Sequence, residues 1–383
     1  MTKLLLGCLS VALINAVSVR AEMRIDPSRV EAIAGFLPPH AAGLGQPATN
    51  RVFWNALAQR SELKPTIANA SKLAQEETPA LPDDLYLDFS KTGNRDRCQR
   101  VIFARNDRVT TFALAECLED KGSFVQPLER EIEAVCRERT WVYPAHDGKL
   151  DNFRGRTVDI DLHAAYVAWN LATANRLLAD KLSPATRQLI RTNIGRRVLQ
   201  PFRDMIEGRR AENWWLRGKN NWSAVCHAGV AGAALALEDS SQTRAWHIAA
   251  AEKYMPFFLQ SFTPDGYCSE GIGYWNYGFG NFLMLAETIR QATGNRIDLL
   301  DDPAAALPAQ FGLRSETING IYPSISDCVP GTKPDANLAG YAAKRFGREL
   351  PASPTARSAG NVDSLFSFLA FATSDEFAPA NIM

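Results

Sequence analysis

Residues 222–237 read WSAVCHAGVAGAALAL, a stretch in which small side chains occupy most positions. Alanine is the strongest helix former, so the stretch predicts a helix despite its two glycines. The distance between packed helices depends on the side chains at their contact, and small residues on most faces allow a close approach. We therefore predict an inner, densely packed helix, and the segments on either side of it decide the fold.

Helical signals continue on both sides of this stretch. Apolar residues recur at helical spacing in 125–137 and along one face of 161–182. Ser183 and Pro184 are typical of a helix start, and Gly294 is a plausible C-terminal cap. Paired helices with short connections predict an all-α array of hairpins, either an open solenoid or a closed toroid. The predicted helices span 109–118, 125–137, 161–182, 183–206, 222–237, 243–262 and 274–292.

Differences in amino-acid composition divide the whole chain into four predicted segments. The start combines Lys3 with an apolar run and small residues near Ala21, the pattern of a secretory signal peptide. Proline and glycine interrupt the following segment and also the end of the chain, where only 364–373 is strongly apolar and fits a short helix or a strand. We expect a signal peptide at 1–21, an irregular and partly helical wrap at 22–85, a helical toroid domain at 86–320 and an irregular segment at 321–383.

Bulk composition restricts the partners. With 383 residues and 46% hydrophobic content, the chain can bury a large core. Its 42 basic and 42 acidic side chains cancel, which removes any global argument for nucleic acid or an anionic membrane surface. The signal peptide predicts a periplasmic or secreted protein, and no later segment has the apolar length needed for membrane insertion.

Cysteine and histidine spacing gives no sign of a metal or cofactor. The cysteines after the signal peptide form no CxxC motif, so we expect mainly buried thiols with room for one or two disulfides. The histidines show no ligand spacing with one another or with cysteine. These cysteines are Cys98, Cys117, Cys136, Cys226, Cys268 and Cys328.

Residues 213–222 read NWWLRGKNNW and contain three tryptophans, three asparagines and two cations. Tryptophan faces stack on sugar rings, while amides and cations bind hydroxyl and carboxylate groups. The pattern predicts a sugar-binding cleft; the alternative is that the tryptophans anchor the core and the asparagines cap the next helix. The candidate site residues here are Trp214, Trp215, Arg217, Lys219, Asn220, Asn221 and Trp222.

A second cluster occupies 265–281. In a regular helix, Tyr274, Tyr277 and Asn281 fall on one face. The interspersed glycines are costly in a helix, which suggests close approach of backbone or ligand. Glu270 and Trp275 are further candidates for substrate contact. The alternative is an aromatic core stripe whose hydroxyls bond to neighbouring backbone.

Four blocks of this sequence, in this order, resemble the signatures of heparinase II/III-like polysaccharide lyases. They are WVYPAHD at 141–147, DIDL at 159–162, NNWSAVC at 220–226 and EGIGYWNYG at 270–278. The similarity spans about 86–327. It implies an incomplete (α/α) toroid and cleavage of a uronic-acid polysaccharide by β-elimination, with an acidic polysaccharide or oligosaccharide as partner.

The resemblance also implies roles for individual residues. Tyr277 corresponds to the tyrosine acid/base, with Tyr274 as the fallback, provided that nearby cations lower the phenol pKa. Asn221, with Asn220 beside it, would neutralise the substrate carboxylate as charge develops. His146 is a candidate for substrate binding. His227 is a weaker candidate and fits better as a core histidine.

Such lyases normally add a β-sandwich after the toroid, and this domain supplies a further histidine, sometimes with a structural metal. Here the last histidine is His247 and the sequence ends at Met383. We therefore expect the toroid domain alone, which implies a truncated or inactive member, or one that uses a partner or a different base.

Two alternatives remain open at the level of sequence. One is a non-catalytic carbohydrate-binding toroid. The other is an inverting glycoside hydrolase built on Asp147, Asp161 or Glu270, which requires two carboxyl groups facing one cleft about 6.5–9.5 Å apart. The identity of the polymer, endo or exo action and the oligomeric state are also left open.

Overall fold

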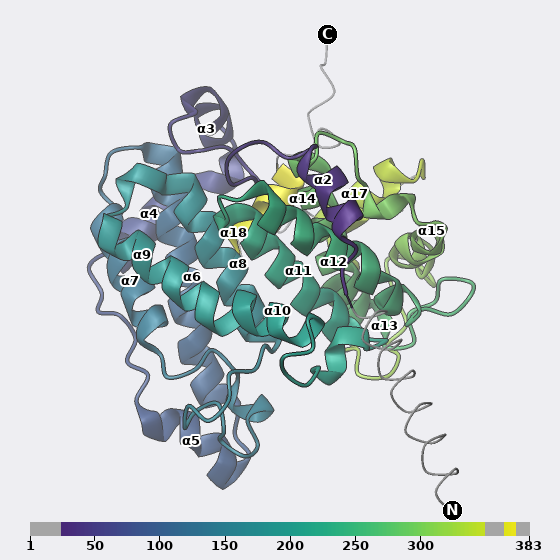
Figure 1. The fold of residues 1–383 in the computed structure, drawn as a ribbon, viewed down its shortest axis with the longest axis horizontal. Coiled ribbons are helices and arrows are strands. Elements are labelled where there is room, and N and C mark those ends of the chain that lie inside the picture. The colour runs from purple at the N-terminus through teal and green to yellow at the C-terminus, as the bar shows by residue number, and fades with distance from the viewer. Residues whose placement is uncertain (1–23, 349–363, 373–383) are drawn as a thin grey trace, which may run out of the picture.

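The computed structural model describes residues 24–348 and 364–372, and the predicted signal peptide lies outside them. Within these ranges the chain is all-α, as predicted, and contains no strand beyond an isolated bridge between Ile318 and Ile321 (Figure 1). The helices are α2 (Pro27–Ala34), α3 (Arg51–Ala58), α4 (Lys64–Leu73), α5 (Asp83–Thr92), α6 (Asp96–Glu119), α7 (Val125–Arg137), α8 (Leu162–Leu178), α9 (Pro184–Ile194), α10 (Gln200–Ile206), α11 (Asn221–Leu237), α12 (Ser241–Leu259), α13 (Gly271–Tyr274), α14 (Gly280–Ala292), α15 (Pro303–Ala309), α16 (Phe311–Arg314), α17 (Ala336–Arg345) and α18 (Leu365–Ala372).

Helix α11 lies in the middle of the molecule, between α8 and α12 (Figure 1). It also packs against α14, and nearly all of its residues are buried. A Cβ atom built at Gly229 would lie 2.4 Å from the Ala165 carbonyl oxygen on α8. The predicted inner, closely packed helix is therefore confirmed, and glycine is what lets the two backbones approach.

A buried ion pair fastens the N-terminal segment to the helical array. The Nε atom of Arg108 on α6 lies 2.6 Å from Glu131 Oε1 on α7, and both side chains are almost fully buried. Arg108 also donates to the carbonyl oxygens of Leu73, the last residue of α4, and Glu76, in the turn after it. This one guanidinium therefore holds α4, α6 and α7 together.

Both ends of the described chain join the same core. Helix α2 packs on α12, α3 packs on α6, and α18 contacts α8 and α14. The core includes Ile25 near the start and Leu369 near the end. Helix α17 was not expected within the irregular segment at 321–383. Helix α18 shows that the apolar run is helical, which is one of the two predicted alternatives, rather than a strand.

Two long helices each contain a π-helical turn, which the sequence analysis did not predict. These turns are η4 (Gly195–Leu199) and η6 (Trp275–Phe279). In each, a backbone N–H donates to the carbonyl five residues earlier: Gln200 to Gly195, and Gly280 to Trp275. Such turns insert one extra residue into a helix and occur often at functional sites. The second one contains Tyr277.

The six cysteines of the described ranges are all buried and free. Burial raises the pKa of the Cys268 thiol to about 11 and that of Cys98 to about 12. These thiols are protonated at neutral pH and are therefore poor nucleophiles.

Candidate functional site

Tyr277 and Asn221 belong to helical segments that meet at Gly278. A Cβ atom at Gly278 would lie 3.1 Å from Asn221 Cβ and 3.3 Å from Asn221 Cα. The backbone of η6 thus presses against the first residue of α11. The structure therefore brings together the two sequence clusters, with Tyr277 one residue before the glycine that contacts Asn221.

The two adjacent asparagines have different environments. Asn220 is the N-cap of α11, and its Oδ1 atom accepts a 3.1 Å hydrogen bond from the Trp222 N–H. Asn221 is the first residue of the helix and is buried, yet within the described ranges its carboxamide makes no recorded hydrogen bond. Because the Asn220 oxygen is already used, capping accounts for Asn220, and Asn221 is the amide that can bind a ligand.

Tyr277 remains 40% exposed, so solvent and ligands can reach its side chain. Its pKa is nevertheless raised well above the ordinary value, first by the protein atoms around the phenol and then by Cys226 and Asp161. The condition set for a base role, that nearby cations lower this pKa, is therefore not met. At neutral pH, Tyr277 is a protonated phenol that can donate a proton but is a poor base.

Tyr274 is half-buried and shows the same direction of shift. Burial raises its pKa, as do the carboxylates of Asp327 and Glu270, while Arg95 acts in the opposite direction. Burial, followed by Asp327, also raises the pKa of Glu270. Neither cluster of the sequence analysis included Arg95 or Asp327, because they come from a distant helix start and a distant loop.

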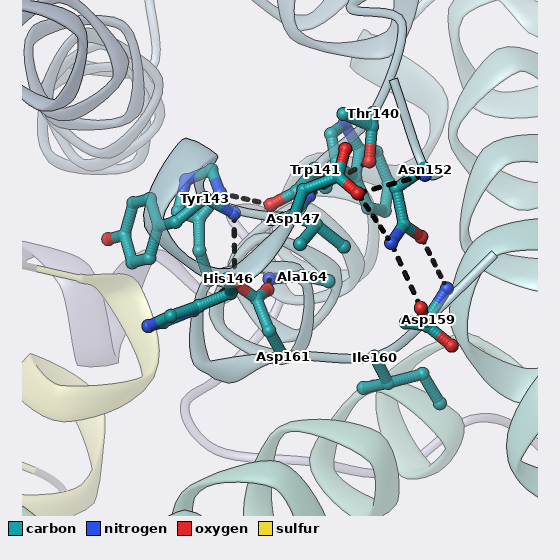
Figure 2. A network of polar contacts seen from close by, with 12 residues as sticks. Thr140, Trp141, Tyr143, His146, Asp147, Asn152, Asp159, Ile160, Asp161 and Ala164 are labelled. Atoms are coloured by element: carbon teal, nitrogen blue, oxygen red, sulfur yellow. Dashed lines mark hydrogen bonds and ion pairs between the residues drawn. The ribbon is translucent and has the colours of Figure 1, made fainter. Parts of the chain in front are cut away.

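A short loop forms the opposite side of the site. It contains Tyr143 and the 3₁₀ turn η2 (Pro144–His146), and Asp161 holds it in place. Asp161 is the N-cap of α8, where Oδ1 accepts from the Ala164 N–H at 2.8 Å. Its Oδ2 atom accepts from the Tyr143 N–H at 2.9 Å and contacts His146 Nδ1 at 2.7 Å (Figure 2).

This contact sets the tautomer of His146. An ionised carboxylate can only accept hydrogen bonds, so in the neutral imidazole Nδ1 of His146 carries the hydrogen and Nε2 has the lone pair. No hydrogen-bond partner for Nε2 is recorded among the described residues. Figure 2 shows the outer nitrogen of the ring pointing away from the labelled polar residues.

Aromatic rings connect His146 to the start of α11. The His146 ring lies 4.5 Å from the Trp222 ring, and Trp222 lies 5.0 Å from Trp214. Trp214, in the 3₁₀ turn η5 (Trp214–Arg217), is 59% exposed. An exposed indole of this kind is a surface on which a sugar ring can stack.

Tyr143 connects the loop to Tyr277. Its ring stacks on His163 at 4.5 Å. Burial raises the pKa of Tyr143, and Asp161 and Tyr277 raise it further, so these groups occupy one shared region. Tyr143 and His163 were not among the site residues predicted from sequence, and Asp161 was predicted only as one carboxylate of an inverting glycoside hydrolase. The position of Asp161 directly before a helix was a signal for a cap.

His163 packs against the Tyr143 ring and is itself held by hydrogen bonds. Its Nδ1 atom lies 2.6 Å from the Trp141 carbonyl oxygen and its Nε2 atom lies 3.0 Å from Asn106 Nδ2. Both ring nitrogens are therefore occupied, and burial lowers the pKa of the imidazole. His163 is a neutral support for Tyr143.

The carboxylate of Asp147 stabilises the loop through hydrogen bonds and is not available as a second reactive group. It is buried and accepts from the Asn152 N–H at 3.1 Å (Figure 2). It also accepts from the Phe153 N–H at 2.8 Å and the Tyr86 hydroxyl at 3.2 Å. Since Asp161 is buried and bonded as well, neither carboxyl group faces a cleft. The carboxylate pair that an inverting glycoside hydrolase requires is not formed by these two residues.

Two of the predicted substrate-binding tryptophans are core residues. Trp215 is 1% exposed and donates from Nε1 to the Ile160 carbonyl oxygen at 2.8 Å. Trp275 is fully buried and donates to the Pro308 carbonyl oxygen at 2.8 Å. Their indole faces are covered by protein, so the assignment of both residues to substrate binding is wrong.

The remaining candidate residues differ in whether their side chains are available to contact a substrate. Arg217 is paired with Glu212, at 3.2 Å, and lies over the Tyr254 ring, whereas Lys219 is exposed. His227 is buried against Trp215 and Tyr254, which agrees with its expected place in the core.

A hollow of about 450 Å³ lies at the start of α6. One of its lining residues, Phe103, packs edge-on against Tyr143 with ring centroids 6.0 Å apart. The hollow therefore borders the loop that carries His146. Its lining residues are Asn94, Asp96, Gln99, Arg100 and Phe103.

Within the described ranges, no group of three or more histidine, cysteine or acidic side chains is arranged to hold a metal ion. None of the helices that the structure describes is long and apolar enough to cross a bilayer. No protein-family model matches the chain, and no curated protein matches its sequence.

Proposed function

We propose that this chain is a polysaccharide lyase that cleaves a uronic-acid polymer by β-elimination, in the periplasm or outside the cell. The observation that carries the proposal is that two helical segments meet at Gly278. One carries Asn221, a buried carboxamide with no recorded hydrogen bond within the described ranges, and the other carries the protonated phenol of Tyr277. The proposed scaffold is an incomplete (α/α) toroid of the heparinase II/III-like kind, with α11 as an inner helix.

The chemistry explains why these two groups belong together. The proton at C5 of a uronate is weakly acidic, because its removal places negative charge on the neighbouring carboxylate. The Asn221 amide would donate to that carboxylate, in a bond that strengthens as charge develops. Tyr277 would donate its proton to the C4 oxygen as the glycosidic bond breaks. Neither role requires a cofactor.

Features around the pair favour a charged sugar polymer as substrate. Trp214 offers an exposed face for stacking, and Trp222 extends this surface toward Asn221. Lys219 on the same loop is exposed and can attract acidic groups.

The test is a panel of uronate polymers, including alginate, heparan and chondroitin. Each elimination creates a conjugated double bond, so turnover is measured as a rise in ultraviolet absorbance. We expect Tyr277→Phe and Asn221→Ala each to lower kcat by about 100-fold or more. Tyr267→Phe removes a hydroxyl elsewhere, and Asn69→Ala removes an exposed amide on α4; both should retain activity. No absorbance change across the panel would reject the lyase.

A carbohydrate-binding protein without turnover is the second candidate. The 59% exposure of Trp214 beside Trp222 favours it, because stacking alone can hold a sugar. This candidate predicts calorimetric binding that Trp214→Ala removes and Tyr277→Phe leaves unchanged. Binding without any absorbance rise would favour it over the lyase.

A further inference from the structure

We infer that His146 is the base that removes the C5 proton, and that Asp161 is a positioning residue that holds the His146 ring in the required tautomer. This inference rests on the proposed lyase function. It goes beyond that function by assigning the proton acceptor to the same helical domain that holds Asn221 and Tyr277.

The site needs a base other than a tyrosine. β-Elimination requires one group that accepts the C5 proton and one that donates to the leaving oxygen. The pKa values of Tyr143, Tyr274 and Tyr277 are all raised, mainly by burial, so these phenols remain protonated near neutral pH. They can serve as donors, but the acceptor must be another group.

His146 has the geometry of an acceptor. Asp161 Oδ2 lies 2.7 Å from Nδ1, which leaves the lone pair of Nε2 unshared among the described residues. The carboxylate is fixed in turn, because Oδ1 accepts from the Ala164 N–H and Oδ2 also accepts from the Tyr143 N–H. The side chain of His146 is 19% exposed, so its outer edge can be reached.

The position of His146 agrees with the chemistry of a uronate. C5 is bonded directly to the carboxylate carbon, so the base must lie near the group that binds the carboxylate. The His146 ring lies 4.5 Å from the ring of Trp222, the residue that follows Asn221. A sugar whose carboxylate meets Asn221 would therefore bring its C5 hydrogen to the side of the site that holds His146.

The other histidines do not offer this combination. His163 has both ring nitrogens occupied. His227 and His247 are buried in the core. His40 is exposed on the N-terminal segment, with no described contact to the site. Of the five histidines, all within the described ranges, only His146 combines access, a fixed tautomer and an Nε2 atom with no partner recorded among the described residues.

The proposed step balances without a further reactant. Nε2 of His146 takes the C5 proton, and the electrons of that bond form the C4–C5 double bond. The C4–O bond breaks, and the departing oxygen takes the proton of the Tyr277 hydroxyl. The products are an unsaturated uronate end and a free hydroxyl on the other fragment. The proton on His146 then returns to the Tyr277 phenolate through solvent.

The first test compares His146→Gln with His40→Gln, the same change at an exposed site. We expect His146→Gln to lower kcat at least about 100-fold with KM changed less than about threefold, while His40→Gln retains wild-type kinetics. Added imidazole should restore part of the turnover of His146→Ala. Wild-type turnover in a folded His146 variant would overturn the inference and leave the lyase proposal standing. Absence of turnover in the wild type would reject both.

The second test does not depend on turnover. Nitrogen-15 NMR of the intact protein should show His146 protonated at Nδ1 and unprotonated at Nε2. Asp161→Asn should shift the proton to Nε2, because the amide donates to Nδ1, and should lower kcat at least about tenfold. A wild-type signal with Nε2 protonated and Nδ1 bare would contradict the inference. Unchanged kcat in Asp161→Asn would remove the positioning role of Asp161.

Discussion

Gly232 on α11 faces the indole ring of Trp169 on α8 so closely that a Cβ atom at Gly232 would come within 2.1 Å of the ring atom Cε2. Trp169 is buried and also stacks in parallel on Phe366, with ring centroids 4.1 Å apart. The tryptophan is therefore held between a glycine and an aromatic ring from the far end of the chain.

Gly232→Ala should destabilise the fold. The added methyl group cannot be accommodated unless α8 and α11 separate or Trp169 leaves its stack, which costs about 1–3 kcal/mol or more in a packed core. The measurement is chemical denaturation followed by circular dichroism. Gly195→Ala is the control, because a Cβ atom there meets nothing within 4 Å and its φ is helical. Equal midpoints for the two variants would contradict this packing.

Gly278→Ala should affect turnover more than stability. Its Cβ atom would lie 3.1 Å from Asn221 Cβ and 3.3 Å from Phe258, so small shifts suffice to relieve the contact. Those shifts separate Asn221 from Tyr277 and disturb the proposed alignment, where displacements on the order of 1 Å can cost about 100-fold in rate. We expect a large fall in kcat/KM with a small change in the unfolding midpoint. A variant with normal turnover would show that the contact does not align the site.

Arg108→Ala should cost about 3–5 kcal/mol of stability, because it leaves the buried Glu131 carboxylate without its cation. Arg137→Ala breaks an exposed pair with Glu133 on the same helix α7 and should cost less than about 1 kcal/mol. Unfolding curves of both variants give the comparison. Similar losses for the two would show that burial of the Arg108–Glu131 pair carries no special weight.

The stability of the fold should decline as the pH falls from about 6.5 to about 4. Burial lowers the pKa of His227 and of His247 to about 4, whereas an unfolded histidine titrates near its model value of 6.5. Between these values the unfolded chain binds more protons than the folded one, so protons favour unfolding. Each histidine contributes up to roughly 3 kcal/mol to this loss. Denaturation midpoints measured across this range, with His247→Gln for comparison, should show a shallower decline in the variant.

Much of the helical array could be predicted from sequence because its signals are local. The predicted helix at 125–137 coincides with α7, where apolar side chains recur at helical spacing. The 222–237 stretch matches α11 to within one residue. Both helices could be predicted because the spacing of apolar or small residues within one helix is visible directly in the sequence.

The π-helical turns could not be predicted in this way. Residues 274–292 have the pattern of one regular helix, and nothing local marks the longer hydrogen bond from Gly280 to Trp275. The choice between α and π hydrogen bonding depends on what packs around the turn, here Asn221 against Gly278.

The composition of the sequence also could not show which of two neighbouring tryptophans is exposed and which is buried. Trp214 and Trp215 are adjacent in the chain, but one is 59% exposed and the other 1%. The difference arises because Trp215 bonds to the Ile160 backbone, a partner 55 residues away in sequence. The Asp161–His146 contact likewise depends on how the loop before α8 returns to the start of that helix.

The π-helical turn η6 makes the proposed site depend on a single surplus residue. Deleting one residue between 275 and 279 would let the turn close with ordinary helical hydrogen bonding, which is locally more favourable. The same deletion would rotate the Tyr277 position relative to Asn221. A shorter chain could therefore fold at least as well and yet lose its proton donor, so at this turn selection for thermal robustness and selection for reactivity would act in opposite directions.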